Sequence, residues 1–327
     1  MSRLMGLIVA ACLFATGAST SVLAADPDWP KSLTLATASP GGIYYVYGDA
    51  LAKILTEKLG IPVNPLPTQG TVHNVKLLDS GGAQLGMTTM GVALQGWNGT
   101  GDWTDGKQVR NMRALFPMYD TPFQFVVLKN SGIQSFADMA EKRIGAGPQG
   151  GTGGTYAPLI FKALRIPVTL RNGAWALIGS QMRSHQLDAM AAAIGVPMPL
   201  ITEFDATEPV DFIPPGDADI ATIRKALPEL GVSVVPAGSY ASLKSDYKTI
   251  GLYNFGVAGK DLPDDLVYAI VKAFYANHDR MVKAIPAARD SVVGNLDRNT
   301  FIPYHPGAVR YYREIGIKIP AVLAGDR

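Results

Sequence analysis

The residues best suited to ligand chemistry are five glycines and two threonines within residues 147–156 (GPQGGTGGTY). Residues 142–146 before this stretch are predicted to form a strand, and residues 156–164 after it a helix. Glycines at a strand-to-helix turn let the backbone approach a ligand closely. The first turn of a helix offers unpaired N–H groups and the positive end of the helix dipole. The stretch therefore predicts a site for an anion such as a carboxylate or a phosphate.

A second turn, at residues 39–45 (SPGGIYY), has the same character and is predicted to form the other half of a cleft. It follows a strand predicted over residues 33–37 and precedes an amphipathic helix predicted over residues 44–59. A strand at 61–66, a helix at 69–78 and a strand at 84–89 are expected next. Strand, turn and helix repeating in this order predict a parallel sheet covered by helices. Ligands bind outside the carboxyl ends of such strands.

Residues 112–128 contain two strand-like runs around Asp120-Thr121-Pro122, and residues 247–258 contain a further one; both segments are predicted to cross between two lobes. We therefore expect an α/β protein with two lobes, each a mostly parallel sheet flanked by helices, and a ligand cleft between them. The predicted division assigns residues 25–120 and the returning residues 249–327 to lobe I, and residues 121–248 to lobe II.

The remaining elements are predicted from local signals. Residues 135–138 (SFAD) are typical of a capping box that opens a short helix. Residues 97–105 are glycine-rich and polar, and residues 203–219 are acidic with prolines, so both are predicted to be loops. Helices are expected at 174–186, 263–276 and 306–314, and a buried strand at 187–194.

Enzyme motifs are weak or missing. Residues 145–150 match G-x-G-x-x-G, but the acidic residue expected about 20 positions later is replaced by Leu170-Arg171-Asn172. The sequence contains no G-x-S-x-G and no H-E-x-x-H. The four histidines, His73, His185, His278 and His305, have no metal-ligand spacing. We expect no catalytic residue, no metal and no cofactor, and therefore not an enzyme.

The first 24 residues are predicted to be a secretory signal peptide. Arg3 precedes the apolar run 4–16, and Val22-Leu23-Ala24 fits a small-x-small cleavage site, so the cut is placed after Ala24. The run is shorter than the ~20 apolar residues of a membrane span. A lipid anchor on Cys12, the single cysteine, is the alternative. Either reading predicts export to the periplasm.

Charge excludes one class of partner. The whole chain has 29 Lys and Arg against 27 Asp and Glu, and removal of Arg3 leaves 28 against 27, a net charge of +1. The sequence contains no long basic block interleaved with aromatic residues, so nucleic acid is not an expected partner. The mature chain is expected to be a soluble monomer.

The order of these motifs resembles the TAXI-type solute-binding proteins of tripartite ATP-independent periplasmic (TRAP) transporters. The resemblance extends through nearly the whole mature chain, and it is carried by the joint order and spacing of several short segments. These are residues 36–45 (ATASPGGIYY), 69–86, 144–156, 187–189 (LDA) with 195–197 (GVP), 235–240 (VPAGSY), 303–308 (PYHPGA) and the Tyr311-Tyr312 pair.

The resemblance implies a type II periplasmic-binding-protein fold that captures a small organic anion, such as a glutamate-like amino acid, a dicarboxylate or an oxoacid. It implies delivery of that anion to the membrane subunits of a TRAP permease. Ala38, where a glycine is common, departs from the family pattern. The ligand contacts that the resemblance implies are Gly42, Ile43, Tyr44, Gln69, Asn74, Thr88, Thr89, Gly151, Thr152, Gly153 and Thr155.

Several of these residues have a second interpretation. Thr152 and Thr155 can cap the helix, Gln69 and Asn74 can belong to the turn and helix surface, and Thr88 and Thr89 can pack at a strand end. Four arginines are candidates for a carboxylate clamp or for solvated surface positions: Arg110, Arg113, Arg171 and Arg183. The rival functions are a binding protein of an ABC importer or of a sensor kinase, and an exported enzyme.

Overall fold

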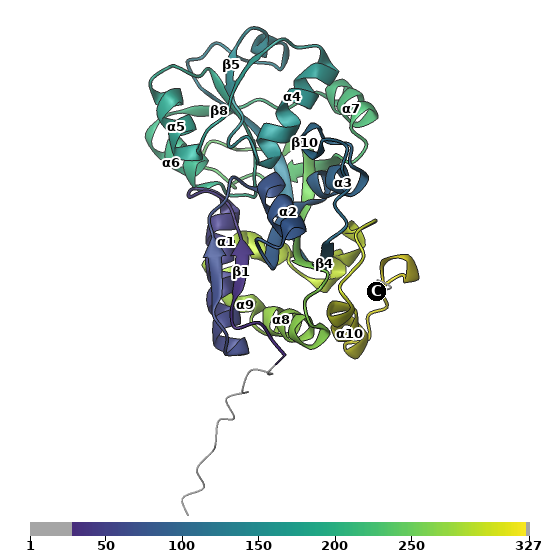
Figure 1. Cartoon of the computed structure of the whole chain (residues 1–327). Coiled ribbons are helices and arrows are strands. Elements are labelled where there is room, and N and C mark those ends of the chain that lie inside the picture. The colour runs from purple at the N-terminus through teal and green to yellow at the C-terminus, as the bar shows by residue number, and fades with distance from the viewer. Residues whose placement is uncertain (1–27, 325–327) are drawn as a thin grey trace, which may run out of the picture.

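The computed structural model describes residues 28–324, so the predicted signal peptide and Cys12 lie outside the described residues. Two halves stand one above the other in Figure 1, and two long strands run between them. These strands are β4 (Met112–Leu128) and β10 (Tyr247–Gly259), which pair antiparallel with each other. The predicted lobe boundaries, after Asp120 and after Lys248, fall inside these strands, and the division itself stays a prediction.

The lower half in Figure 1 contains a parallel group of strands in the order β2-β1-β3, with β10 beside β3. The chain reaches this half first and returns to it at the C-terminal end. Its strands are β1 (Leu33–Ala36), β2 (Val63–Leu66) and β3 (Leu85–Thr89), and its helices are α1 (Ile43–Leu59), α2 (Thr71–Ser80), α3 (Met90–Asn98), α8 (Asp264–Ala276), α9 (His278–Ala284) and α10 (Pro306–Glu314).

The upper half contains a second parallel group, β7-β5-β6, with β4 antiparallel to β7. β8 pairs with β4, and β9 pairs with β10. Its strands are β5 (Arg143–Gly145), β6 (Thr169–Arg171), β7 (Ala189–Ala193), β8 (Val210–Phe212) and β9 (Gly231–Val235), and its helices are α4 (Thr152–Leu164), α5 (Trp175–Arg183), α6 (Pro199–Thr207) and α7 (Asp217–Ala226). The α/β class is confirmed, with antiparallel strands only where the chain crosses or adds β8 and β9.

Aromatic side chains fill the core of each half. In the lower half, Phe116 on β4 stacks on Phe274 of α8, with ring centroids 3.8 Å apart and planes 9° apart. In the upper half, Phe125 on the same strand packs edge-on against Phe136 at 4.5 Å. β4 therefore contributes large buried rings to both cores, and burial of such rings is a main source of folding free energy.

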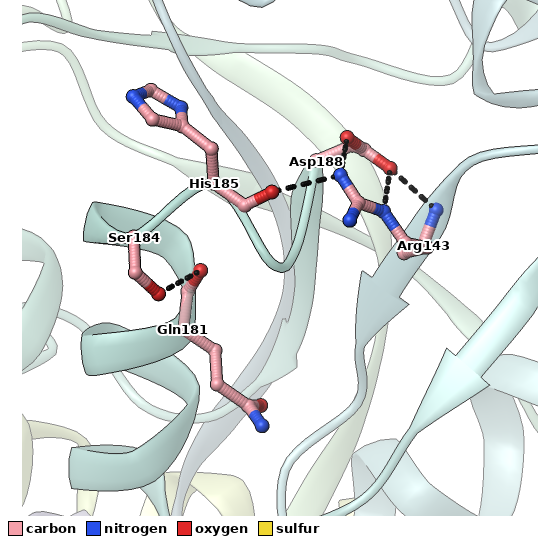
Figure 2. Close-up of polar contacts among 5 residues, drawn as sticks. All are labelled: Arg143, Gln181, Ser184, His185 and Asp188. Atoms are coloured by element: carbon pink, nitrogen blue, oxygen red, sulfur yellow. Dashed lines mark hydrogen bonds and ion pairs between the residues drawn. The ribbon is translucent and has the colours of Figure 1, made fainter.

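An ion pair fixes the end of the upper half that is opposite the carboxyl ends of its strands. Figure 2 shows Arg143, at the start of β5, beside Asp188, which precedes β7. Arg143 donates to both carboxylate oxygens of Asp188, at 2.7 and 2.9 Å, and to the carbonyl of His185 at 2.9 Å. These bonds tie the turn between α5 and β7 to β5 and set the register of the two strands.

Some sequence predictions were wrong in their details. Residues 203–219 are not a loop, because α6 covers residues 199–207, β8 covers residues 210–212 and α7 begins at Asp217. The buried face of α6 is formed by Leu200, Ile201 and Phe204. The acidic residues of this region made that helical pattern difficult to recognise in the sequence.

Three other segments also differ from prediction. Residues 112–128 form one continuous strand that includes Pro122. At residues 135–138 the carboxylate of Asp138 accepts from Ser135 as predicted, but only a short 3-10 helix follows. The predicted loop at residues 97–105 contains the last turn of α3 and a 3-10 helix at Asp102–Thr104.

Candidate functional site

A cavity of about 60 Å³ lies where the carboxyl ends of the two parallel strand groups face each other. Its walls come from the turns after β1, β2, β5 and β7, from the start of α5 and from the two crossing strands. The lining residues are Ala38, Ser39, Gly42, Ile43, Tyr44, Gln69, Gly70, Thr71, Tyr119, Thr121, Ala146, Pro148, Gly151, Thr152, Gly153, Trp175, Ala193, Ile194, Gly195 and Asn254. Both predicted turns therefore line one cavity.

Four helices begin at the wall of this cavity: α1, α2, α4 and α5. Their N-cap residues are Gly42, Gly70, Gly151 and Ala174, and no side chain caps any of the four. None of the four carries an acidic residue in its first turn. The N–H groups of a first helical turn have no intrahelical acceptor, and the helix dipole places partial positive charge there. The cavity is therefore surrounded by positive helix ends that no carboxylate neutralises.

The start of α4 lies four residues earlier than the sequence predicted. The helix begins at Thr152 and not at Tyr156, so Thr152 and Gly153 belong to its first turn. Gly153 is required there because a Cβ at this position would lie 2.5 Å from the carbonyl oxygen of Ala146. This close packing brings the first turn of α4 directly against the end of β5, and hence into the cavity wall.

Direct contacts close the two halves against each other at this point. The backbone N–H of Val72 on α2 donates to the carbonyl of Gly150 at 2.9 Å. Thr152 on α4 lies 3.4 Å from the hydroxyl of Thr71 and 3.3 Å from that of Thr89. Two helix starts from opposite halves are thus hydrogen-bonded to each other, which is the arrangement of a cleft that has closed.

A buried hydrogen-bond chain links the cavity to the crossing strands. The hydroxyl of Tyr44 on α1 donates to Oδ1 of Asn254 on β10. The Nδ2 group of Asn254 donates to the carbonyl of Tyr119 and to Oγ1 of Thr121, both on β4. Tyr44 and Asn254 therefore satisfy each other, and their side chains hold α1 to both strands.

Tyr119 is different, because its hydroxyl is buried and has no hydrogen-bond partner within the described residues. The side chain is only 2% exposed and lines the cavity. Burial raises the pKa of the Tyr119 phenol well above its ordinary value, so the hydroxyl keeps its proton and can donate it. A buried polar group without a partner is uncommon and points to a missing ligand or water.

The described residues that line the cavity include no Asp, Glu, Lys, Arg or His. The four arginines considered from the sequence lie elsewhere. Arg183 pairs with Glu203 at 2.7 Å and with Glu208 at 3.2 Å, and Arg110 stacks over Trp97. Arg113 donates to backbone carbonyls, and Arg171 is an exposed residue at the end of β6. Any charge on a ligand would therefore be balanced by helix ends and hydrogen bonds.

The structure brings most of the predicted contact residues together. Seven of them line the cavity: Gly42, Ile43, Tyr44, Gln69, Gly151, Thr152 and Gly153. Thr88 and Thr89 are buried behind the wall at the end of β3, and Thr89 reaches the site only through Thr152. The hydroxyl of Thr155 donates back to the carbonyl of Gly151 on its own helix. Direct ligand contact by these residues stays a prediction.

Asn74 also lies behind the wall and is fully buried. Its Nδ2 group donates to the carbonyls of Thr37 and Met87, each at 2.8 Å, and its Oδ1 accepts from Thr68 at 2.6 Å. Asn74 therefore ties the ends of β1 and β3 to the turn that carries Gln69 and Gly70. This geometry makes it a residue that shapes the cavity wall.

Sequence reasoning missed four lining residues that lie in or beside the crossing strands: Tyr119, Thr121, Gly195 and Asn254. A signal for two of them exists, because Thr121 and Asn254 are polar residues inside long apolar strand runs. The start of α5 adds Trp175 to the lining. This tryptophan is 6% exposed and packs on Gly147, where a Cβ would lie 2.4 Å from its ring.

Within residues 28–324, no group of three or more His, Cys, Asp or Glu side chains is placed to hold a metal ion. No helix in the same part of the chain combines the length and the apolar character needed to cross a membrane.

The fold, with a cavity between its two groups of parallel strands, places the chain among proteins with the periplasmic binding-protein fold. A solved periplasmic transporter is 13% identical and covers 81% of this chain and 88% of its own, with a TM-score of 0.56. A protein of Bordetella bronchiseptica RB50 is 17% identical over 89% of this chain and 91% of its own, with a TM-score of 0.50. The substrate-binding protein of an amino acid ABC transporter is 11% identical over 79% and 98%, with a TM-score of 0.47.

At these identities the likeness shows the fold alone. The sequence itself gives the family. The chain belongs to the NMT1-like family, whose sequence pattern matches residues 35–316. That range contains every residue that lines the cavity.

Proposed function

We propose that this chain is an exported solute-binding protein that captures a small organic anion and hands it unchanged to the membrane subunits of a transporter. The resemblance to TAXI-type proteins favours a TRAP permease as the recipient, and a glutamate-like amino acid, a dicarboxylate or an oxoacid as the ligand. The proposal includes export to the periplasm after cleavage behind Ala24, a monomeric state, and lobes formed by residues 25–120 with 249–327 and by residues 121–248.

One observation carries the proposal: two uncapped helix starts from opposite halves, those of α2 and α4, meet at one cavity. Unpaired amides at a helix start bind anions. Because Val72 and Gly150 are bonded across the same contact, capture of an anion and closure of the halves would occur together. The cavity walls contain no acid, base or nucleophile pair of the kind that catalysis needs, which supports binding without chemistry.

A thermal-shift screen tests capture. The mature chain, beginning at Ala25, would be heated with amino acids, oxoacids and dicarboxylates, and ligands that raise the melting temperature would then be measured by calorimetry. Mass spectrometry of the released ligand should recover it unchanged. Chemical conversion of the ligand would contradict the proposal and favour an exported enzyme.

A transport assay tests delivery. Vesicles containing the membrane subunits of a TRAP transporter would be supplied with the loaded protein and an ion gradient. We expect uptake that requires the gradient and is insensitive to ATP. Uptake only by the membrane subunits of an ABC importer, driven by ATP, would replace the TRAP assignment with the ABC one.

A further inference from the structure

We infer that the site selects a monocarboxylate that carries neither an ammonium group nor a second carboxylate, and that Tyr119 donates a hydrogen bond to it. This inference rests on the proposed function and narrows its ligand class. It separates oxoacids with one carboxylate from the glutamate-like amino acids and dicarboxylates that the resemblance also allows.

An ammonium group has no anionic partner among the described residues that line this cavity. The described residues that line it carry no carboxylate, and the four helix ends around it present partial positive charge. A buried cation needs an anionic partner or a set of acceptors that balance its lost hydration. An α-amino acid would place its ammonium beside positive helix ends, so its binding is disfavoured relative to the acid without nitrogen.

A single carboxylate is well matched by the same walls. The first-turn amides of the helices supply donors and partial positive charge without a counter-ion. Tyr119 also lines the cavity, and its hydroxyl is a buried donor that has no hydrogen-bond partner within the described residues. An acceptor oxygen placed by the ligand would satisfy it, which removes the cost of leaving a buried hydroxyl unpaired.

A second carboxylate would meet no Lys, Arg or His among the described residues that line the cavity. Tyr44 and Asn254 bond to each other, and the Asn254 amide is also used by Tyr119 and Thr121 on β4. Two carboxylates held close together in one cavity without a cation also repel each other. The remaining wall is largely apolar and includes Ile43, Ile194 and Trp175, which fit a short hydrocarbon group. A short apolar tail is therefore expected on the other side of the carboxylate.

Matched probes separate these alternatives by calorimetry on the mature chain. 3-Methyl-2-oxobutanoate and isovalerate carry one carboxylate and an apolar tail, valine adds the ammonium, glutamate adds both charges, and 2-oxoglutarate adds a second carboxylate. Isovaleramide keeps the shape and removes the charge. We expect one of the two monocarboxylates to bind at least about 100-fold more tightly than valine, glutamate, 2-oxoglutarate or isovaleramide, the size of effect that an unpaired buried charge produces.

Tyr119→Phe tests the named residue. We expect the variant to bind the better monocarboxylate roughly tenfold more weakly, because a hydrogen bond to a charged group is lost. Tyr47→Phe is the matched control, since the buried Tyr47 hydroxyl bonds Ser291 and does not line the cavity. Equal affinities of Tyr119→Phe, Tyr47→Phe and the unaltered protein would overturn the role of Tyr119.

The outcomes distinguish this inference from the proposed function. Tighter binding of valine, glutamate or 2-oxoglutarate than of both monocarboxylates would overturn the ligand class and leave solute capture standing. Tighter binding of isovaleramide would overturn the requirement for an anion. Failure of every probe, and of the wider screen, to bind at millimolar concentration would overturn both.

Discussion

Gly70 and Gly151 approach each other so closely that a Cβ on Gly70 would lie 3.0 Å from the Cα of Gly151. The two residues are the N-caps of α2 and α4, which belong to opposite halves. The absence of a side chain at Gly70 lets the two helix starts meet, and with them the amides that surround the cavity. Closure of the site therefore depends on the glycine at position 70.

Gly70→Ala should weaken ligand binding by roughly ten- to thirtyfold, which corresponds to ~1–2 kcal/mol lost from closure. The new methyl group keeps the helix starts apart, and the backbone φ of +111° is itself unfavourable for alanine. Calorimetry with the best ligand from the screen gives the affinity. Gly81→Ala is the control, since Gly81 also has positive φ, +75°, and a Cβ there meets nothing within 4 Å. Equal losses in both variants would show that backbone strain, and not the contact with Gly151, is responsible.

Asn74→Ala should lower the free energy of unfolding by about 2–4 kcal/mol, because the carbonyls of Thr37 and Met87 and the Thr68 hydroxyl lose a buried partner. Ligand affinity should fall with it, as the turn at Gln69 loses its anchor. Urea denaturation and calorimetry measure the two effects. Normal stability combined with lost binding would contradict the positioning role and favour direct contact of Asn74 with the ligand.

Asp120 should make the protein less stable as the pH rises from about 4 to 7. Burial raises the pKa of its carboxyl to about 6 in the folded protein, against 3.8 in the unfolded chain. A raised carboxyl pKa means that folding favours the protonated form, so its contribution is complete below pH ~4 and is lost as the pH rises through 6.

The variant Asp120→Asn should therefore equal the unaltered protein in stability near pH 4 and exceed it by about 3 kcal/mol near pH 7. Denaturation curves recorded across this range measure the difference. Asp211→Asn, at an exposed position on β8, is the control for the loss of one carboxyl group. A constant difference across the pH range would show that Asp120 does not titrate in this interval.

Asp188→Asn should destabilise the protein by about 1 kcal/mol at neutral pH, because the ion pair with Arg143 shown in Figure 2 is partly exposed to solvent. The Arg143 guanidinium holds the pKa of the Asp188 carboxyl below its ordinary value. The sign is opposite to that of Asp120: this contribution is present above pH ~4 and is lost as the pH falls below it. Thermal melts at pH 7 and pH 3 should show the difference between the two proteins shrinking at the lower pH.

Both glycine turns were predicted from sequence because the signal is local. Glycines that follow a strand and open a helix are recognisable in a window of ten residues, and the turns at 39–45 and 147–156 do line one cavity. The α/β class followed from the same alternation of strands and helices.

Tyr119 and Asn254 could not be placed in the same way. They are 135 residues apart, and they meet only because β4 and β10 pair with each other. Nothing local distinguishes a polar residue that faces a cavity from one that satisfies a neighbouring strand. The absence of charged side chains from the described lining could not be predicted for a similar reason. The sequence shows Arg183, Glu203 and Glu208, but it does not show that they pair with each other.

β4 and β10 lie side by side where they pass between the halves, and Asn254 is bonded to both the cavity wall and the neighbouring strand. A hydrogen-bonded pair of strands bends out of its plane more easily than its strands slide past each other, because bending leaves the hydrogen bonds between them intact. Under the proposed function, the two halves would open and close mainly by bending of this pair. The membrane subunits would then recognise the closed, loaded form by its surface, without contact with the ligand.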